Sequence, residues 1–437
     1  MALRILNITD PADRRTFDSL LEKLRSQTSA GGDVARSVTE IIEDVKHRGD
    51  EALVQYMRQW TNPMFTDEMI RVDNVDMAAA EKLIDPPVRD AMLRSIDHVR
   101  TYQQHVKPSD PPTVEIDGAQ LGMRFTPFDR VGLAIPGGKA AYPSTVIMTA
   151  VPAQVAGVED ICVVCPPPTG GGDEAEVSHL VLGVCHMLGV TEVYRIGGAQ
   201  AIAALAYGTE TVGRVDFIAG PGNAFVQQAK RQLFGTVGID GFYGPSEVVV
   251  LVDGSADPAK VAADLLAQAE HDPGSCFLIG TDRAVIDRID AEVDRQLPNR
   301  HRRGAIEQSL ADWSCAIVAA DDDAGLELVD TLAAEHATLA VEDPQATLDQ
   351  LRHGGAWFLG DGTPVASGDY YAGPSHCLPT GTTARFTSGI SVYTFLKRSS
   401  VEHYPAGPSP QAIDDIAALA EAEGLDAHAA SVRARQR

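Results

Sequence analysis

The sequence is short of positive charge. Lys and Arg number 36 against 61 Asp and Glu in 437 residues, which gives a formal net charge of -25 at pH 7. No cluster of basic residues relieves this excess, so a nucleic-acid backbone or an anionic membrane surface would repel the chain. The expected partner is a small molecule, with no nucleic acid and no membrane involved.

Long apolar segments are missing as well. No run of about eighteen apolar residues occurs, the length that a membrane-spanning helix requires. The first ten residues contain no apolar core of signal-peptide length. Cysteine is sparse, and its six residues are scattered along the chain, which suits a reduced compartment better than a disulfide framework. We therefore expect a cytoplasmic protein.

Two short motifs offer little information. The G-x-G-x-x-G fingerprint of many dinucleotide-binding turns does not occur. The C-x-x-C spacing of Cys162 and Cys165 does occur, but it lies in the apolar run 161–165, which is typical of a buried strand. Core packing is the favoured interpretation there, over a redox or zinc site.

Short apolar runs alternate with segments of helical length over most of the chain, whose composition is that of an ordinary globular protein. The predicted strands are 131–135, 161–165, 192–196 and 216–219 in a first unit and 247–252, 276–280, 315–319, 338–341 and 357–359 in a second. Strict alternation of strand and helix predicts parallel sheets covered by helices on both faces. The expected fold class is α/β, with two doubly wound, Rossmann-like units.

Four segments follow from this pattern. Residues 1–130 are expected to form a helical lead-in that packs on the second unit, since apolar residues recur there at helical spacing. Residues 131–243 and 244–390 are the two α/β units. Residues 391–437 form a tail with two amphipathic helices, at 411–420 and 423–435, which have too few residues for a core of their own. The tail must dock on this subunit or on a neighbour.

Each predicted strand of the first unit ends in a glycine-rich loop. These loops are residues 136–139, 166–172, 197–200 and 220–223. The carboxyl ends of parallel strands are where open α/β sheets bind ligands, and glycine allows a backbone to approach a phosphate closely. A nucleotide or phosphate site and plain tight turns both remain open on this evidence.

Several side chains are candidates for a metal site. Gln268 and His271 stand three apart at the end of a helix that should begin at Asp257, so they share a face, although such a pair is more often solvated. Asp369 and His376 lie in a loop rich in glycine and proline, 367–380, of a composition that often carries function. Glu423 and His428, in the tail, would by themselves be surface residues. The mixed set that suits zinc is Gln268, His271, Asp369 and His428.

Glu335 and His336 are candidates for proton transfer. They are adjacent, and we expect them to close a helix that begins near residue 323, just before the strand 338–341. A carboxylate beside an imidazole can act as a general base near neutral pH. The alternative is an exposed helix end, where the helix dipole favours histidine.

The order of these motifs identifies a family resemblance. The chain resembles histidinol dehydrogenases, NAD-dependent enzymes that make histidine from its amino alcohol in two oxidations, from residue 48 to the C-terminal helix. The segments that carry the resemblance are PGGKAAYPS (136–144), GGAQAIAA (197–204), GPGN (220–223), GPSE (244–247), LLAQAEH (265–271) and GDYYAGPSH (368–376).

The resemblance implies a set of roles. One zinc ion per subunit would be bound by Gln268, His271 and Asp369, and His428 would complete the site from the other subunit of a homodimer with interwoven tails. The substrate, L-histidinol, would contact Ser246, His376 and Glu423, together with His336 and the zinc ligands. NAD would lie on the glycine loops, with Gln200 and Asn223 at the matching positions.

The resemblance also implies the chemistry. His336 would take the hydroxyl proton as hydride passes to NAD, Glu335 would activate water to hydrate the bound aldehyde, and His336 would again be the base in the second oxidation. The chain departs from the family at Ala134, where tyrosine is usual before the Pro-Gly-Gly turn and contacts the cofactor, and at Ala337, where leucine usually follows the catalytic histidine. These departures leave open a paralogous dehydrogenase of another small primary alcohol. A non-catalytic remnant of an enzyme is disfavoured, because Glu335 and His336 are both present.

Overall fold

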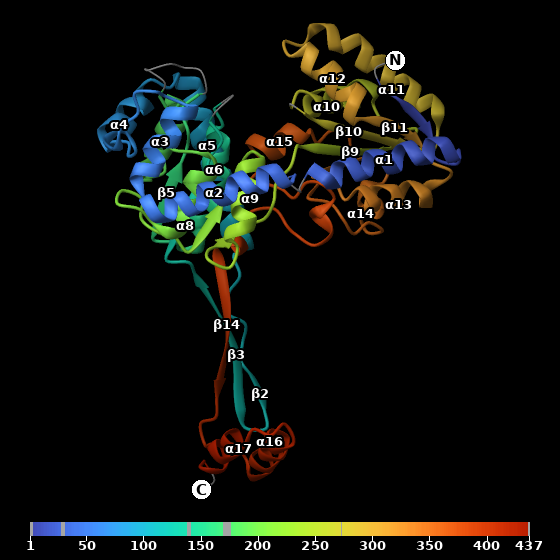
Figure 1. Ribbon diagram of the computed structural model, residues 1–437. Helices are drawn as coiled ribbons and strands as arrows, with labels where there is room; N and C mark the ends of the chain where they lie inside the picture. Colours follow the sequence, from blue (N-terminus) through green and yellow to red (C-terminus); the bar gives the residue numbers. More distant parts are fainter. Residues whose placement is uncertain (1–2, 28–30, 138–140, 169–175, 272, 436–437) are drawn as a thin grey trace.

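The computed structural model describes residues 3–27, 31–137, 141–168, 176–271 and 273–435. Figure 1 shows two α/β units beside each other and an arm that projects from the first unit and carries the C-terminus at its tip. The described part of the chain contains three sheets, one in each unit and one in the arm. No helix among these residues is both long enough and apolar enough to cross a lipid bilayer.

The first unit is a five-stranded parallel sheet in the order β6-β5-β4-β7-β8. Its strands are β4 (Arg130–Ala134), β5 (Asp160–Val164), β6 (Glu192–Tyr194), β7 (Phe217–Ala219) and β8 (Gly238–Ile239). One core cluster includes α4 (Asn74–Lys82), α5 (Pro86–Val106), α6 (Pro143–Ala156) and α7 (His179–Met187). The other includes α2 (Gly32–Arg48), α3 (Asp50–Trp60), α8 (Gly198–Tyr207) and α9 (Ala224–Leu233). The sheet is therefore covered on both faces.

The second unit repeats this plan with six parallel strands in the order β1-β11-β10-β9-β12-β13. Its strands are β1 (Ile5–Asn7), β9 (Glu247–Val252), β10 (Ser275–Gly280), β11 (Cys315–Val318), β12 (His336–Ala340) and β13 (Ala356–Leu359). Helices α10 (Pro258–Ala269), α11 (Arg283–Gln296) and α12 (Arg303–Trp313) share one core cluster, and α1 (Pro11–Gln27) and α13 (Asp322–Leu332) share the other. Every residue of β9 is buried, as its valine-rich sequence requires for a strand packed on both faces.

The arm is a three-stranded antiparallel sheet of β2 (Val114–Ile116), β3 (Ala119–Pro127) and β14 (Leu396–His403). Phe217 of the first unit packs against the base of the arm. The Phe217 ring stacks on Phe128 with the ring centres 4.8 Å apart, and it meets the Phe395 ring edge-on at 6.0 Å. The tip holds α16 (Pro410–Ala422) and α17 (Asp426–Arg433), away from both units (Figure 1). The short remaining helices are α14 (Pro344–Leu348), α15 (Val365–Tyr370), η1 (Asp67–Met69), η3 (Leu297–Asn299), η4 (Thr383–Arg385) and η5 (Val392–Phe395).

The α/β prediction is confirmed, since each predicted strand overlaps a strand of one of the two parallel sheets. The sequence did not indicate β1, β8 or the three arm strands. The expected packing of residues 1–130 is corrected: β1 and α1 join the second unit, but α2 to α5 cover the first. The reason is that the apolar stripe of α2, with Val38, Ile41 and Val45, packs in the cluster that also contains α8 and α9.

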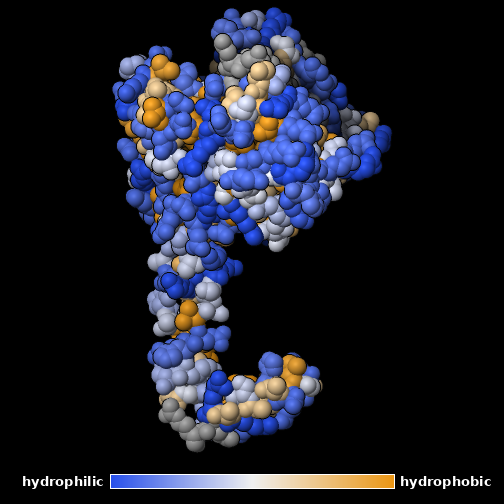
Figure 2. Space-filling model, turned by 60° about the vertical axis from the view of Figure 1, so that its left-hand side comes forward, coloured by the Kyte–Doolittle hydropathy of each residue, from blue (hydrophilic) through white to orange (hydrophobic). Residues whose placement is uncertain are grey.

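The two tail helices are also confirmed, but they do not dock on the body of their own chain. Ile413 and Ala417 of α16 pack with Ala429 and Val432 of α17 in a small separate cluster. Leu419 stays 68% exposed beside this cluster, and Figure 2 shows apolar surface on the arm and its tip. The tip therefore presents apolar side chains that nothing in the described chain covers.

Candidate active site

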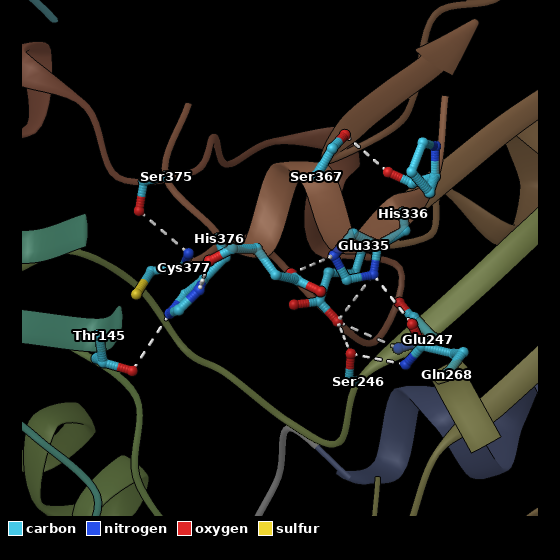
Figure 3. Close-up of polar contacts among 12 residues, drawn as sticks. Thr145, Ser246, Glu247, Gln268, Glu335, His336, Ser367, Ser375, His376 and Cys377 are labelled. Carbon is cyan, nitrogen blue, oxygen red and sulfur yellow. Dashed lines mark hydrogen bonds and ion pairs between the residues drawn. The ribbon is translucent and has the colours of Figure 1, made fainter. Parts of the chain in front are cut away.

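The candidate site lies where the amino ends of β9 and β12 meet the first unit (Figure 3). His336 pairs with Val248 in the parallel register of these two strands, so Glu335 lies beside Glu247. The strand order of the second sheet reverses between β9 and β12. Open α/β sheets usually bind ligands at the carboxyl ends of such strands, and here the opposite ends carry the polar side chains.

Local structure directs the Glu335–His336 pair into this site. Helix α13 ends at Leu332, and Ala333 takes a left-handed conformation with φ of +43°, which turns the chain into β12. The expectation that the pair closes a helix is therefore corrected: Glu335 lies in the connection, and His336 is the first residue of the strand. Both side chains are buried.

Four side chains form a directional relay of hydrogen bonds (Figure 3). His336 Nδ1 donates to Gln268 Oε1 at 3.1 Å, and Gln268 Nε2 donates to Ser246 Oγ at 2.7 Å. Ser246 Oγ donates to Glu335 Oε2, which also accepts the backbone N–H of Glu247 at 3.2 Å. Each amide and hydroxyl group is used once as a donor and once as an acceptor, so the relay fixes the orientation of all four side chains.

The relay sets the charges of the pair. Burial raises the pKa of Glu335, and the His336 charge and the hydrogen bond from Ser246 only partly oppose this effect. Burial lowers the pKa of His336, but the carboxylates of Glu335 and Asp369 outweigh burial and raise it. A carboxyl group with a raised pKa next to an imidazole that can hold a proton is the kind of pair that general base catalysis uses.

Asp369 and His376 approach from the segment after β13. Asp369 Oδ1 lies 3.7 Å from His336 Nε2. Burial raises the pKa of Asp369, but the hydrogen bond and charge of His336 outweigh burial, so the pKa is lowered. His376 donates from Nδ1 to the Asp369 carbonyl at 2.9 Å, and its Nε2 lies 3.2 Å from the hydroxyl of Thr145. Thr145 belongs to the first turn of α6, so this helix of the first unit lies on the other side of the site.

Three of the four predicted zinc ligands, Gln268, His271 and Asp369, belong to the second α/β unit, which forms the body of the chain together with the first. Gln268 and Asp369 lie on either side of the His336 ring, and His271 follows Gln268 just beyond the end of α10. Burial lowers the pKa of His271, and the charge of Asp369 only partly opposes this lowering. One side of the residue still faces solvent. A neutral imidazole, a carboxylate and an amide oxygen are ligands that zinc accepts.

The four predicted zinc ligands do not come together within one chain. No three His, Cys, Asp or Glu side chains in the described ranges are grouped closely enough to hold a metal ion. His428 is exposed on α17 and Glu423 is exposed at the end of α16, both at the tip of the arm (Figure 1). The structure does not bring these two residues to the site of their own subunit.

The two predicted cofactor residues lie at the carboxyl edge of the first sheet. Gln200 is in the first turn of α8, and its buried Oε1 has no hydrogen-bond partner among the described residues. Asn223 caps α9, because its Oδ1 accepts from the backbone N–H of Phe225 at 3.0 Å and of Val226 at 3.2 Å. An orphaned amide oxygen and a helix N-terminus at one sheet edge fit a polar cofactor.

The glycines of these loops allow neighbouring loops to pack closely, because a side chain at these positions would clash. A Cβ atom on Gly137 would lie 2.2 Å from the Pro166 carbonyl oxygen, and one on Gly197 would lie 2.6 Å from the Pro166 ring. A Cβ on Gly220, whose φ is +115°, would lie 2.2 Å from the carbonyl oxygen of Ala134. Loop packing is thus one use of the glycines, while residues 138–139 and 169–172 of the predicted loops lie outside the described ranges.

Similarity to known proteins identifies the family of the chain. The family model described as histidinol dehydrogenase matches residues 24–436. The chain belongs to the histidinol dehydrogenase family. The histidinol dehydrogenases of a Synechococcus strain and of Rhodopirellula baltica are 45% and 42% identical to it, covering 95% and 99% of this chain and 96% and 97% of theirs. The crystal structure of histidinol dehydrogenase from Elizabethkingia anophelis has a TM-score of 0.89 and 30% identity, and covers 99% of this chain and 98% of that chain.

Membership of the histidinol dehydrogenase family makes the chain a dehydrogenase, and the structure adds two polar residues that sequence reasoning did not select. Thr145 contacts His376, and Glu247 is 1% exposed beside Glu335. Burial and the neighbouring charge of Glu335 raise the pKa of Glu247 to about 8. A glutamate that opens a run of valines was the available signal, because such a run predicts burial of its first residue too.

Proposed function

We propose that the protein oxidises L-histidinol to L-histidine through bound L-histidinal, with two hydride transfers to NAD, as the last steps of histidine biosynthesis. The observation that supports this proposal most directly is the relay from His336 through Gln268 and Ser246 to Glu335. It holds two potential bases in one buried site, and each base has one atom left for the substrate.

His336 is the base for the first oxidation. Its Nδ1–H is engaged by Gln268, so the lone pair of Nε2 is the one that takes the hydroxyl proton. Asp369, 3.7 Å from Nε2, stabilises the imidazolium that results. The alcohol thereby loses a proton to His336 and a hydride to the cofactor, which leaves the aldehyde.

Glu335 is the base for hydration of the aldehyde. Its Oε2 accepts hydrogen bonds from Ser246 and from the backbone of Glu247, so Oε1 is the atom that takes a proton from water. The hydroxide adds to the aldehyde carbon while the imidazolium of His336 returns its proton to the carbonyl oxygen, which gives the hydrate and leaves His336 neutral again. The hydrate then loses a proton to His336 and a hydride to a second NAD, which leaves the carboxylic acid. Burial of both residues limits the escape of the reactive aldehyde.

When bound, NAD supplies the hydride acceptor and zinc supplies a fixed positive charge that anchors the substrate's imidazole and amino groups. Gln200 and Asn223 are the residues proposed to contact NAD. Gln268, His271 and Asp369 are those proposed to hold zinc in the body of the chain. The Gln268 amide oxygen has a second lone pair, so it can serve a metal without losing its bond from His336.

A homodimer completes the site in this proposal. His428 would be the fourth zinc ligand, and Glu423 a substrate contact, each supplied to the neighbouring subunit by the arm. The position of both residues at the tip of the arm, and the exposed apolar side chains around them, support an exchanged tail.

Product stoichiometry tests the proposal. Purified protein loaded with zinc is supplied with L-histidinol and NAD, and the NADH formed per histidinol consumed is counted. We expect two NADH per histidinol, loss of turnover with a chelator, and recovery when zinc is returned. One NADH with release of the aldehyde would refute the two-step scheme.

A panel of other primary alcohols in the same assay tests the substrate. Reduction of NAD with one of these alcohols, without turnover of histidinol, would replace the proposal by the paralogous dehydrogenase. Ala134 and Ala337, both buried next to the proposed sites, would then be the first positions to examine.

A further inference from the structure

Lys230 has no exposed surface, although it carries a charge. Lysine is almost never fully buried unless its ammonium group is paired. Here Lys230 Nζ forms an ion pair with Asp240 and donates a hydrogen bond to the carbonyl oxygen of Gly220 at 3.0 Å. Asp240 Oδ2 in turn accepts the backbone N–H of Gly220 at 2.6 Å. One buried ion pair therefore holds both backbone polar groups of one glycine.

Tyr243 and Gln227 add hydrogen bonds to the same buried cluster and to the same turn. The Tyr243 hydroxyl donates to Asp240 Oδ2 at 2.9 Å, and Lys230 Nζ lies 4.9 Å from the centre of the Tyr243 ring. Gln227 accepts the backbone N–H of Tyr243 at 3.0 Å and donates to the carbonyl oxygen of Gly222 at 3.2 Å. Burial and the charge of Asp240 raise the pKa of Tyr243, so its hydroxyl keeps the proton that it donates.

The segment held in this way is the 220–223 turn at the carboxyl edge of the first sheet. It begins at Gly220, whose φ of +115° disfavours any other residue, and ends at Asn223, the cap of α9. Glu335 is close enough for its charge to contribute to the raised pKa of Tyr243, but no hydrogen bond or ion pair among the described residues joins Lys230 or Asp240 to the relay.

Stability alone is a weak explanation for these buried charges. Replacing a buried ion pair by apolar residues of similar size is often neutral or stabilising, because desolvation of the two charges offsets their attraction. What the pair provides, and apolar packing does not, is a set of directional hydrogen bonds to one turn of backbone.

We propose that Lys230, Asp240 and Tyr243 form a positioning unit that fixes the 220–223 turn in the conformation that binds the dinucleotide cofactor. This inference rests on the proposed function, which assigns Asn223 of the same turn to NAD. The three residues act through the turn and touch neither the substrate nor the proton-transfer pair.

The test uses the full-length, zinc-loaded protein and measures the Kd of NAD by calorimetry, the KM of histidinol and the Tm. The double variant Lys230→Met with Asp240→Leu keeps apolar packing and removes the hydrogen bonds to the turn. We expect its Kd for NAD to rise by about tenfold or more with an unchanged KM for histidinol. Its Tm should fall, because the Gly220 N–H and the Tyr243 hydroxyl lose their acceptor. Tyr243→Phe, which removes one hydroxyl and preserves the ring, should raise the Kd about threefold.

Arg130→Met is the matched control. Arg130 pairs with Glu192 at the amino edge of the same sheet, far along the strands from the 220–223 turn, so its loss should leave the Kd of NAD unchanged. If Tyr243→Phe and the double variant both bind NAD as tightly as the parent, the positioning role is wrong while the proposed function stands. If the parent protein itself does not bind NAD, the cofactor assignment and the positioning role are both wrong.

Discussion

The two ring nitrogens of His336 have different surroundings, and this difference assigns their roles. Nδ1 donates to Gln268, whereas Nε2 faces the Asp369 carboxylate. Burial lowers the pKa of His336, but two carboxylate acceptors, Glu335 and Asp369, outweigh burial, so the buried imidazole keeps a raised pKa. The same acceptors would stabilise the imidazolium formed when His336 takes a proton.

His336→Ala should lower kcat by about 10²- to 10⁴-fold, because a positioned general base contributes that much to proton transfer. Bound zinc, measured by elemental analysis, should stay at the parent level, since the proposed ligands are other residues. His301→Ala, which removes an exposed imidazole, is the control and should keep full activity. Full activity in His336→Ala would refute the assignment of the base.

Glu247 gives a prediction for the dependence of stability on pH. Its folded-state pKa is about 8 against an ordinary value of 4.5, so the folded chain holds a proton that the unfolded chain has already released between these values. The contribution of Glu247 to stability is therefore greatest below about pH 4.5 and falls as the pH rises to about 8. Glu247→Gln has no proton to lose and should gain stability relative to the parent across this window. The upper limit is about 5 kcal/mol, for about 3.5 pH units.

Denaturant unfolding at pH 5 and pH 8 measures this difference. A free-energy gap between Glu247→Gln and the parent that is the same at both pH values would show that Glu247 titrates normally in the folded protein.

At the scale of elements, α5 holds the segment that bears Asp369 and His376. Ser95 on α5 donates to the Tyr370 carbonyl at 2.6 Å, and His98 meets the Tyr371 carbonyl at 2.9 Å. This helix packs on α6 in the first unit, although the segment that it holds follows the last strand of the second. The helix therefore fixes part of the second unit's site against the first unit.

Gly373→Ala should disturb this contact. Gly373 has a φ of +115°, and a Cβ atom there would lie 2.8 Å from Tyr102 Cβ on α5. We expect the variant to raise the KM of the alcohol substrate several-fold, as Asp369 and His376 are displaced. Gly360→Ala is the control, because its φ is +76° but its Cβ would meet nothing within 4 Å. Both variants bear the cost of a left-handed residue, about 1–2 kcal/mol, so equal effects on KM would refute the contact as the cause.

At the scale of the whole molecule, the arm separates two parts of one proposed site. Strands β3 and β14 run the full length of the arm, and Glu423 and His428 lie beyond it at the tip (Figure 1). Apolar side chains remain exposed along the arm and at the tip, including Val401 at 45% and Leu425 at 42%. A second copy of the chain is the partner that would both cover them and receive the two polar residues.

Complementation between inactive variants tests this exchange. Co-expression of His336→Ala with a Glu423→Ala, His428→Ala double variant should restore about one quarter of the parent activity per dimer. Half of the dimers are then mixed, and one of their two sites combines an intact body with an intact tail. If the tail served its own subunit, no site would be intact and the mixture would stay inactive.

Truncation after Gly407 should remove both bound zinc and activity, because α16 and α17 leave with His428 and Glu423. The two units should still fold, since their core clusters contain no residue of this segment. Circular dichroism would check the fold, and stoichiometric zinc in the shortened protein would exclude a ligand from the tail.

The sequence by itself determined most of the helices and strands of the two α/β units, and it indicated a set of candidate site residues whose roles stay predictions. Asp257 caps α10 as expected, accepting from the backbone of Ala259, and the valine run of residues 247–252 forms β9. Capping and periodicity depend on neighbours within a turn or two of the chain, so they can be read locally. The order of the glycine, Gln-His and Glu-His motifs was enough to indicate the family.

Only the tertiary structure decided how these residues meet. Ser246 reaches Glu335 across 89 positions of sequence, and His376 meets Thr145 across 231, because strand pairing and the contact between the two units bring them together. Nothing within a local window specifies such pairings, nor that residues 119–127 and 396–403 form one arm. The hydrogen bonds of Lys230 and Asp240 to Gly220 could not be predicted from the sequence for the same reason. They depend on burial of the ion pair, which arises only when helices cover the sheet.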